Sequence, residues 1–308
     1  MPLLVTGTIG IDTVETPHGM AADVLGGSAV YFSFAASLLS PVRLVGVVGD
    51  DFPKSFQAMF SQRPIDTAGL ELRKGAKTFR WQGKYVGDMN AAETLRTDLN
   101  VVSERPPVIP EAFRDSQFVF LANTHPALQR GFIGQLKSPK LIVCDTMNLW
   151  ITEFRDELVK TLGQVHGVIF NDGEARLLTG ESNLILAGLE VLRLGPRFVI
   201  IKKGEHGAVL VHRREEGDDD DGLFVMPAYP TTKVVDPTGA GDSFAGGVMG
   251  YLASTGRTDL EAIKSAMVRG ACLASITIES FSLDSIRSAE KKDVDRRLAE
   301  FRRISSHT

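Results

Sequence analysis

The feature of this chain that most constrains its fold is a regular alternation of short apolar runs with helical patterns. The run "VRLVGVV" at 42–48 is followed by "FPKSFQAMF", and "KLIVCD" at 140–145 by "LWITEFRDELVKTLG". Strands that are apolar throughout and separated by helices are typical of a mostly parallel sheet covered on both faces. The sequence therefore predicts a doubly wound α/β fold with helices on both faces of the sheet.

Polar residues stand where the apolar runs end, and we read the first run, "LLVTGTIGID", as one strand that ends at Asp12. In open α/β sheets, ligands bind outside the carboxyl ends of the strands. The strand ends therefore predict an active-site edge formed by Asp12, Asn123, Asp145, Asn171, Lys202 and Lys203.

Two segments depart from this alternation, although 308 residues suit one domain, 1–308, better than two. In "TFRWQGKYVGD", strand alternation puts Phe79, Trp81 and Tyr85 on one face and Arg80, Gln82 and Lys84 on the other. We interpret this segment as part of a small β-sheet lid, with lid strands inserted at roughly 13–20 and 70–102. The acidic run 215–221 is interpreted as a solvated hairpin loop.

Composition restricts the partners of the chain. A formal net charge of -4 gives no overall attraction to nucleic acid or to an anionic membrane. The longest nearly apolar run, 29–39, is shorter than the ~20 residues of a transmembrane helix, and the first residues lack the basic region of a secretory signal. Cys144 and Cys272 lie in apolar contexts and are expected to be buried and unpaired. We expect a cytoplasmic protein that binds small molecules.

The stretch "DPTGAGDSFAGG", 236–247, joins glycines to two acids just before a helical region. It contains no P-loop pattern, and Phe244 stands where a dinucleotide fingerprint needs its third glycine. A glycine turn that opens directly into a helix remains. Gly239 and Gly241 let backbone N–H groups converge, and the helix N-terminus adds partial positive charge. The stretch therefore predicts an anion hole suited to a phosphoryl group.

Asp242 lies in the first turn of the predicted helix, where the anionic form of a carboxyl group is stabilised. It is expected to stay ionised and to accept a proton from a substrate hydroxyl beside the anion hole. An equally simple structural explanation is that Asp242 caps its helix and the glycines allow close helix packing.

At this point the sequence resembles a known family. "DPTGAGDSFAGGVM" is similar to the C-terminal signature of the PfkB, or ribokinase-like, carbohydrate kinases, and "GTIGID", "GGSAVYFSFAASLL", "VRLVGVVGDDFP" and "NDGEARLLTG" extend the resemblance through most of the chain. The resemblance implies one α/β domain with a β-sheet lid, ATP as phosphoryl donor and magnesium. It also implies that Asp242 is the base and that Gly239, Ala240 and Gly241 form the anion hole.

The resemblance assigns further residues to the nucleotide and the metal. Asn171 and Glu174 match an N-x-x-E segment that acts on phosphate-bound Mg²⁺, usually through water, although a capping box would use the same pair. Asp236 resembles an acid that helps to hold a monovalent cation such as K⁺ in some relatives. Lys203, Gly204 and Gly207 match a strand-to-turn segment beside the nucleotide. Ala271, Ala274 and Ser275 lie on one face of a predicted helix, where they would fit the adenine or, equally, close helix packing.

Asp12, Gly26 and Gly27 match positions that contact acceptor hydroxyls in relatives, but Tyr31 stands where many relatives have asparagine. An aromatic residue there could select a different polyol or stack on a base. We therefore expect an ATP-dependent kinase of a neutral sugar, inositol or nucleoside. Alternatives are a sugar-phosphate kinase, a kinase of a vitamin-like heterocycle, and a ligand-binding protein without turnover. The aromatic lid face is also a candidate homodimer surface.

Overall fold

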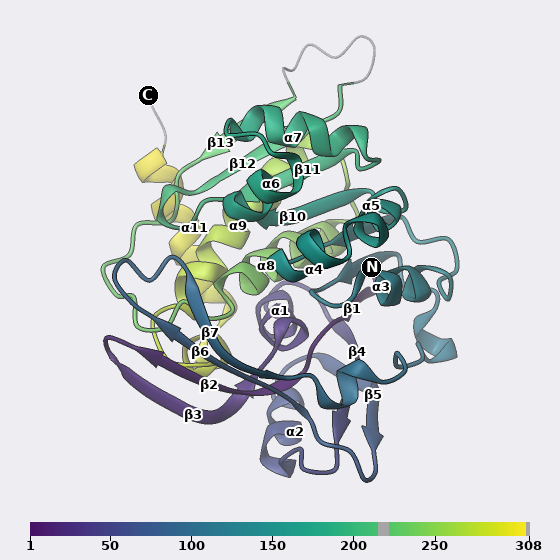
Figure 1. The fold of residues 1–308 in the computed structure, drawn as a ribbon. Coiled ribbons are helices and arrows are strands. Elements are labelled where there is room, and N and C mark those ends of the chain that lie inside the picture. The colour runs from purple at the N-terminus through teal and green to yellow at the C-terminus, as the bar shows by residue number, and fades with distance from the viewer. Residues whose placement is uncertain (215–221, 306–308) are drawn as a thin grey trace.

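The computed structural model describes residues 1–214 and 222–305, so the acidic run 215–221 lies outside the described residues. Within the described chain the strands form two sheets (Figure 1). The larger sheet has nine strands, in the order β13 (Leu223–Met226), β12 (Ala208–His212), β11 (Phe198–Lys202), β10 (Gly167–Asn171), β9 (Leu141–Cys144), β8 (Phe118–Leu121), β1 (Leu3–Thr6), β4 (Val42–Gly49) and β5 (Ile65–Arg73). From β11 to β5 each strand pairs with its neighbour in parallel, and β12 and β13 add an antiparallel edge.

Helices cover both faces of this sheet, which confirms the doubly wound prediction. Alternate residues of the central strands point to opposite faces: Phe118 and Phe120 of β8 join one hydrophobic core, and Val119 and Leu121 join the other. The first core packs against α1 (Ser28–Ala36), α8 (Ala240–Thr255), α9 (Leu260–Thr277), α10 (Asp284–Ser288) and α11 (Lys291–Ser305). The second packs against α3 (Pro126–Ile133), α4 (Asn148–Glu153), α5 (Arg155–Leu162), α6 (Asp172–Thr179) and α7 (Leu184–Arg193).

The remaining elements are α2 (Lys54–Phe60) and the short 3-10 helices η1 (Asn100–Ser103), η2 (Glu111–Phe113) and η3 (Gly204–His206). Cys144 and Cys272 are buried free thiols, as predicted. In the described part of the chain, no helix has the length and apolar character needed to cross a membrane.

The smaller sheet lies to one side of the larger one and has the strand order β3 (Gly19–Gly26), β2 (Gly10–Thr16), β6 (Phe79–Tyr85) and β7 (Ala92–Asp98) (Figure 1). The reading of "LLVTGTIGID" as a single strand was wrong. The run divides into β1, which ends at Thr6 in the larger sheet, and β2, which carries Asp12 in the smaller sheet. Gly7 and Gly10 flank the break between the two strands.

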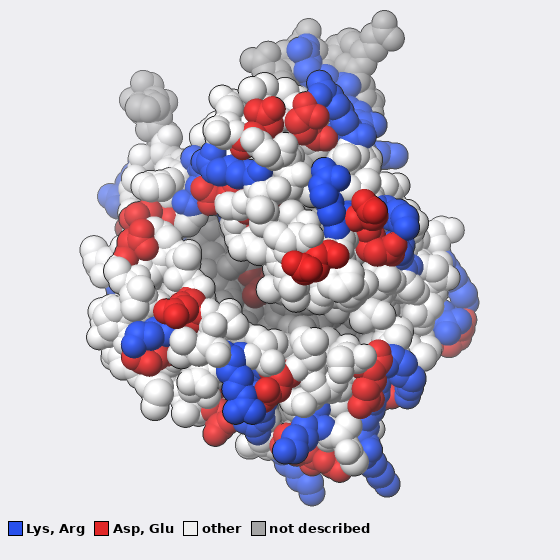
Figure 2. Space-filling view, in the orientation of Figure 1, with Lys and Arg blue, Asp and Glu red and all other residues white. Residues whose placement is uncertain are grey.

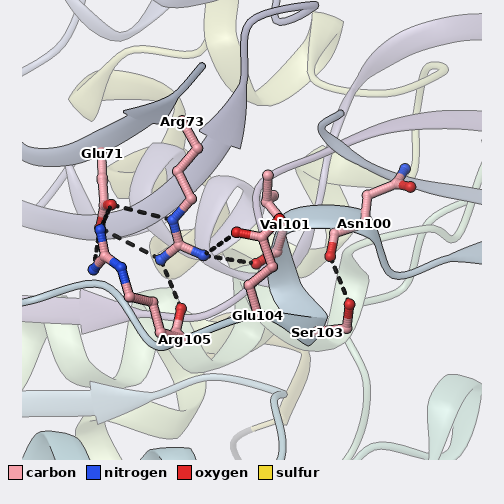
Figure 3. A network of polar contacts seen from close by, with 7 residues as sticks. All are labelled: Glu71, Arg73, Asn100, Val101, Ser103, Glu104 and Arg105. Atoms are coloured by element: carbon pink, nitrogen blue, oxygen red, sulfur yellow. Dashed lines mark hydrogen bonds and ion pairs between the residues drawn. The ribbon is translucent and has the colours of Figure 1, made fainter. Parts of the chain in front are cut away.

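Arg73, at the end of β5, anchors the segment through which the chain leaves the smaller sheet. Its guanidinium, only 8 % exposed, bonds Glu71 on its own strand at 3.1 Å. It also reaches the segment after β7, donating to the Val101 carbonyl at 3.1 Å, to Glu104 at 3.0 Å and to the Arg105 carbonyl at 2.6 Å (Figure 3). A buried guanidinium with all these partners fixes the base of the smaller sheet against the body of the protein.

Candidate active site

The carboxyl ends of the central strands bring the candidate residues to one edge of the larger sheet. β9 ends just before Asp145, β10 ends at Asn171 and β11 at Lys202. The N-terminus of α8 lies at the same edge, because Asp145, Lys202 and Glu174 each influence Asp242 electrostatically. Figure 2 shows a hollow across this face of the molecule with acidic side chains within it. The structure therefore brings together the strand ends and the glycine turn that the sequence singled out separately.

The glycine turn has the open form that an anion site needs. Gly239 has a φ of 75° as the N-cap of the 16-residue helix α8, and a Cβ there would lie 2.2 Å from the Tyr31 ring. Only glycine suits both the backbone conformation and the contact. Within the described residues no side chain caps α8. The Ala240 N–H donates to the Pro237 carbonyl at 3.1 Å, whereas the Gly241 N–H has no acceptor among the described residues.

Asp242 has a raised pKa, which differs from the expectation that its helix N-terminus would dominate. Burial raises the pKa of this carboxyl to about 6, the Lys202 ammonium opposes the rise, and the Glu174 carboxylate adds to it. Desolvation of the charged form thus outweighs the Lys202 charge and the backbone hydrogen bond that favour ionisation. A carboxyl group with this pKa is mostly ionised at neutral pH and has a proton affinity suited to a general base.

Of the two lysines predicted at this edge, Lys202 lies beside the glycine turn. A Cβ on Gly241 would lie 2.7 Å from the Lys202 Nζ. The Lys203 backbone N–H donates to the Gly207 carbonyl at 2.8 Å. Gly204 and Gly207 have positive φ values of 54° and 84°, which explains their residue type by backbone conformation.

Asn171 and Glu174 form the capping box that was weighed as the structural alternative. The Asn171 Oδ1 accepts from the Glu174 N–H at 2.8 Å, and the Glu174 Oε2 accepts from the Asn171 N–H at 2.7 Å. Each side chain keeps one polar atom for other partners. Burial raises the pKa of Glu174, with Lys202 opposing. The pair therefore starts α6, and Glu174 also contributes a buried carboxyl oxygen to the site edge.

Asp12 lies in a buried pocket formed by glycines. It is 3 % exposed, and its Oδ1 has no hydrogen-bond partner among the described residues. Burial raises its pKa to about 7, the Gly27 backbone amide opposes the rise, and Asp236 and Asp242 add to it. A Cβ on Gly26 would lie 1.9 Å from the Asp12 Oδ2. The paired glycines thus make room for this carboxyl group, whose Oδ1 is left without a partner among the described residues.

Tyr31 does not offer the open stacking surface that the sequence suggested. The side chain is 1 % exposed, and its ring packs under Gly239 in the glycine turn. Burial raises its pKa well above the usual value for tyrosine. The Tyr31 hydroxyl has no hydrogen-bond partner within residues 1–214 and 222–305, and the Ser282 hydroxyl, which influences its pKa, donates to the Leu25 carbonyl at 2.9 Å. Tyr31 thus supports the turn and presents a buried, unpaired hydroxyl.

The remaining predicted residues are held mainly by protein contacts. The two carboxylate oxygens of Asp236 accept from the Thr238 N–H at 2.9 Å and the Ser282 N–H at 3.0 Å. Ala271 and Ser275 are buried in α9, and the Arg297 guanidinium donates to the Ser275 hydroxyl at 2.6 Å. Ala274 alone of the three is partly exposed. Close helix packing therefore accounts for Ala271 and Ser275.

The inner and outer faces of the smaller sheet differ in chemistry. Strand β2 pairs in parallel with β6, so Asp12 and Gly10 share a face with Trp81 and Phe79. Arg80 lies on the opposite face, where it pairs with Asp23 at 2.7 Å. An open pocket of about 560 Å³ on this outer face is lined by Ile11, Thr13, Asp23, Asp51, Lys77, Arg80, Trp81, Gln82, Arg96, Asp98 and Asn100.

The edge of the doubly wound sheet thus joins a glycine turn, a helix N-terminus and an adjacent carboxylate. The model of the pfkB family carbohydrate kinases matches residues 128–288, more than half of the chain. The chain belongs to this family and is a sugar or nucleoside kinase, as the sequence predicted.

Three known proteins illustrate the similarity. The chain is 32% identical to a cytidine kinase of Thermococcus kodakarensis over 279 residues, which cover 87% of this chain and 94% of that protein. It is 33% identical to an inositol 3-kinase of Arabidopsis thaliana over 326 residues, 99% of this chain and 83% of that protein. Its fold matches the aminoimidazole riboside kinase of Salmonella enterica, solved with its riboside and an ATP analogue, with a TM-score of 0.76, 17% identity and coverage of 97% and 100%. ATP is a substrate of kinases with this fold.

Proposed function

We propose that this kinase transfers the γ-phosphoryl group of ATP to a hydroxyl of a small neutral carbohydrate or nucleoside, with Asp242 as general base and residues 239–241 as the anion hole. The observation that carries the proposal is the position of a half-buried carboxylate in the first turn of an uncapped helix. Phosphoryl transfer needs chiefly a positioned acceptor oxygen, a base and donors around the equatorial oxygens.

In the proposed reaction the acceptor hydroxyl lies between Asp12 and Asp242. The Asp242 carboxylate takes the hydroxyl proton while the acceptor oxygen attacks the γ-phosphorus, and ADP leaves. The backbone N–H groups of the turn, with their positive helix end, stabilise the charge on the transferring group. The unpaired Asp12 Oδ1 supports a role in holding a second acceptor hydroxyl, because a buried polar atom without a partner is costly unless a ligand completes it.

The residues at this edge fit a magnesium ion that is held largely through water. Three carboxyl groups surround one lysine, Lys202, at this edge: those of Asp145, Glu174 and Asp242. Oxygen ligands and an excess of acidic groups suit a hard divalent cation. No cluster of three His, Cys, Asp or Glu side chains in the described residues is close enough to hold an ion alone. When bound, Mg²⁺ would neutralise phosphate charge, and Asn171 and Glu174 would hold its water ligands.

Lys203, Gly204, Gly207 and Ala274 are proposed to border the nucleotide. The smaller sheet reaches this segment, because the Asn90 Nδ2 donates to the Glu205 Oε1 at 3.4 Å and a Cβ on Gly204 would lie 2.6 Å from the Asn90 Oδ1. The sheet thus spans from Asp12 to the nucleotide segment, which supports its role as a lid over both substrates.

Charge on the lid supports a neutral acceptor. The two cations that could hold an acceptor phosphate, Arg80 and Lys84, lie on the face opposite to Asp12 and pair with Asp23 at 2.7 Å and with Glu15 at 2.6 Å. The names of the cytidine and inositol 3-kinases agree with an acceptor that carries no phosphate. Phe79 and Trp81 on the inner face suit the apolar faces of a sugar, inositol or nucleoside.

Two further proposals concern a monovalent cation and a dimer. In a K⁺ site near Asp236 the carboxylate oxygens would bind the ion through the lone pairs that the Thr238 and Ser282 N–H groups leave free, with backbone oxygens as further ligands. A homodimer through the lid would have to use its charged outer face, because the aromatic side chains turn inward and the Tyr85 side chain lies near the Thr238 hydroxyl, at 3.4 Å. Apolar contact therefore gives the dimer little support.

The experiment that tests the function is a panel of pentoses, hexoses, inositols, nucleosides and their monophosphates assayed for ADP release. We expect turnover with a free polyol or nucleoside, and kcat/KM for its monophosphate should be lower. A preference for a sugar phosphate would favour the sugar-phosphate kinase and require Arg80 or Lys84 to reach the acceptor. Saturable binding of an acceptor with no ADP release would favour a ligand-binding protein without turnover.

A further inference from the structure

Lys202 lies where the transferring phosphoryl group would have to be. It is the last residue of β11, and its register partner in β10 is Asn171, so both residues stand at the end of their strands, beside α6. Its Nζ lies close to Gly241, in the first turn of α8, at 2.7 Å from the position of a Cβ on that glycine. The side-chain ammonium of Lys202 therefore lies beside the glycine turn at the N-terminus of α8.

The surroundings of Lys202 leave its ammonium available. Burial raises the pKa of Asp145, Glu174 and Asp242, and Lys202 is the strongest opposing influence on each of them. Yet in the described part of the chain Lys202 makes no hydrogen bond or salt bridge with any of the three. An ammonium that influences three carboxyl groups and is committed to none can move to a ligand without breaking a protein contact.

We propose that Lys202 is a catalytic residue of this kinase, whose Nζ binds the γ-phosphoryl group of ATP as it passes to the acceptor. This inference rests on the proposed function and adds to it a cation that the glycine turn alone lacks. The bond between the acceptor oxygen and the γ-phosphorus forms, and the bond from that phosphorus to the β,γ-bridging oxygen breaks with its electron pair leaving on ADP. The acceptor proton goes to Asp242, and Lys202 stays charged throughout.

A lysine suits this position because of its shape and flexibility. The ammonium is a compact charge on a flexible stem, so it can follow the group from donor to acceptor. The backbone N–H dipoles of the turn are fixed, so they cannot follow the phosphoryl group as it moves. Lys202 Nζ therefore stabilises the charge of the group in transit more than that of ADP, which has lost the γ-phosphoryl group.

The test compares Lys202→Met with the matched control Lys54→Met, the same substitution at an exposed lysine at the start of α2. Calorimetry with Mg²⁺ measures the affinities for ADP and for a non-hydrolysable ATP analogue, and ADP release measures kcat. We expect Lys202→Met to lower kcat by roughly 10²–10³-fold, the usual effect of losing one transition-state donor. It should weaken binding of the triphosphate at least about tenfold while ADP binding changes little. Lys54→Met should behave nearly as the wild type in both assays.

Three results would overturn the inference: wild-type kcat in Lys202→Met, an equal loss of affinity for ADP and the triphosphate, or the same losses in Lys54→Met. If Lys202→Met does not fold, Lys202→Arg takes its place. This variant keeps the positive charge, so it should still bind the triphosphate analogue more tightly than ADP. If the wild type releases ADP with no acceptor of the panel, the proposed function fails. The comparison of ADP with the triphosphate still shows whether Lys202 binds the γ-phosphoryl group.

Discussion

Replacing Asp12 with asparagine should make the nucleotide-free protein more stable at alkaline pH and less able to bind its acceptor. Asparagine resembles the protonated carboxyl group in shape but carries no charge to bury. Burial raises the pKa of Asp12 from 3.8 to about 7. The folded protein therefore holds a proton that the unfolded chain has lost, so its stability falls as pH rises through this window.

The magnitude follows from the pKa values. One pKa unit corresponds to about 1.4 kcal/mol, so the ionised carboxylate costs the folded state about 4 kcal/mol above pH 7. Part of this cost is already present at pH 5. The stability advantage of Asp12→Asn over the wild type should therefore grow by about 3 kcal/mol between pH 5 and pH 8.

Urea unfolding of both proteins at several pH values, without nucleotide or acceptor, measures this difference. Calorimetry with the acceptor found in the panel measures the acceptor affinity of both proteins. We expect the affinity of Asp12→Asn to be at least about tenfold lower, because a hydrogen bond to a charged group is lost. If the difference in unfolding free energy between the two proteins does not change with pH, the claim that burial raises the pKa of Asp12 is refuted. Unchanged acceptor affinity would remove Asp12 from the acceptor site.

Three other substitutions test separate parts of the structure. Gly239→Ala should cost roughly 1–3 kcal/mol in urea unfolding, because its Cβ meets the Tyr31 ring at a positive φ; a neutral effect would contradict this packing. Glu174→Gln should raise the Mg²⁺ concentration for half-maximal rate while its amide oxygen still accepts from Asn171, and an unchanged requirement would leave only the capping box. Arg73→Met should speed amide exchange in residues 99–105 and cost roughly 1–3 kcal/mol, whereas unchanged exchange would show that the base of the smaller sheet is held elsewhere.

The parts of this protein that depend on local sequence could be predicted. The alternation of apolar runs and helices fixes the doubly wound sheet, because each strand must be covered on both faces. The capping box at Asn171 and Glu174 and the turn at Gly239 lie within a few residues of chain, so their spacing is readable.

Features set by contacts between distant segments could not be predicted. Lys202 and Lys203 look alike in the sequence, and which of them reaches the site depends on the register of β11 against β10. Tyr31 is buried because α1 packs against a turn some two hundred residues further along the chain. The pKa of Asp242 depends on burial by the whole fold, and that effect exceeds the opposing influence of Lys202.

The pH dependence of kcat in the wild type and in Asp242→Asn, with the best acceptor of the panel, tests the central claim most directly. If Asp242 is the general base, the substitution should lower kcat by roughly 10²–10⁴-fold while affinity for ATP changes little. The wild-type rate should fall as pH drops through about 6, where Asp242 takes up a proton. A folded Asp242→Asn variant with near-normal kcat would contradict the account and leave Asp242 as a residue that only stabilises its helix.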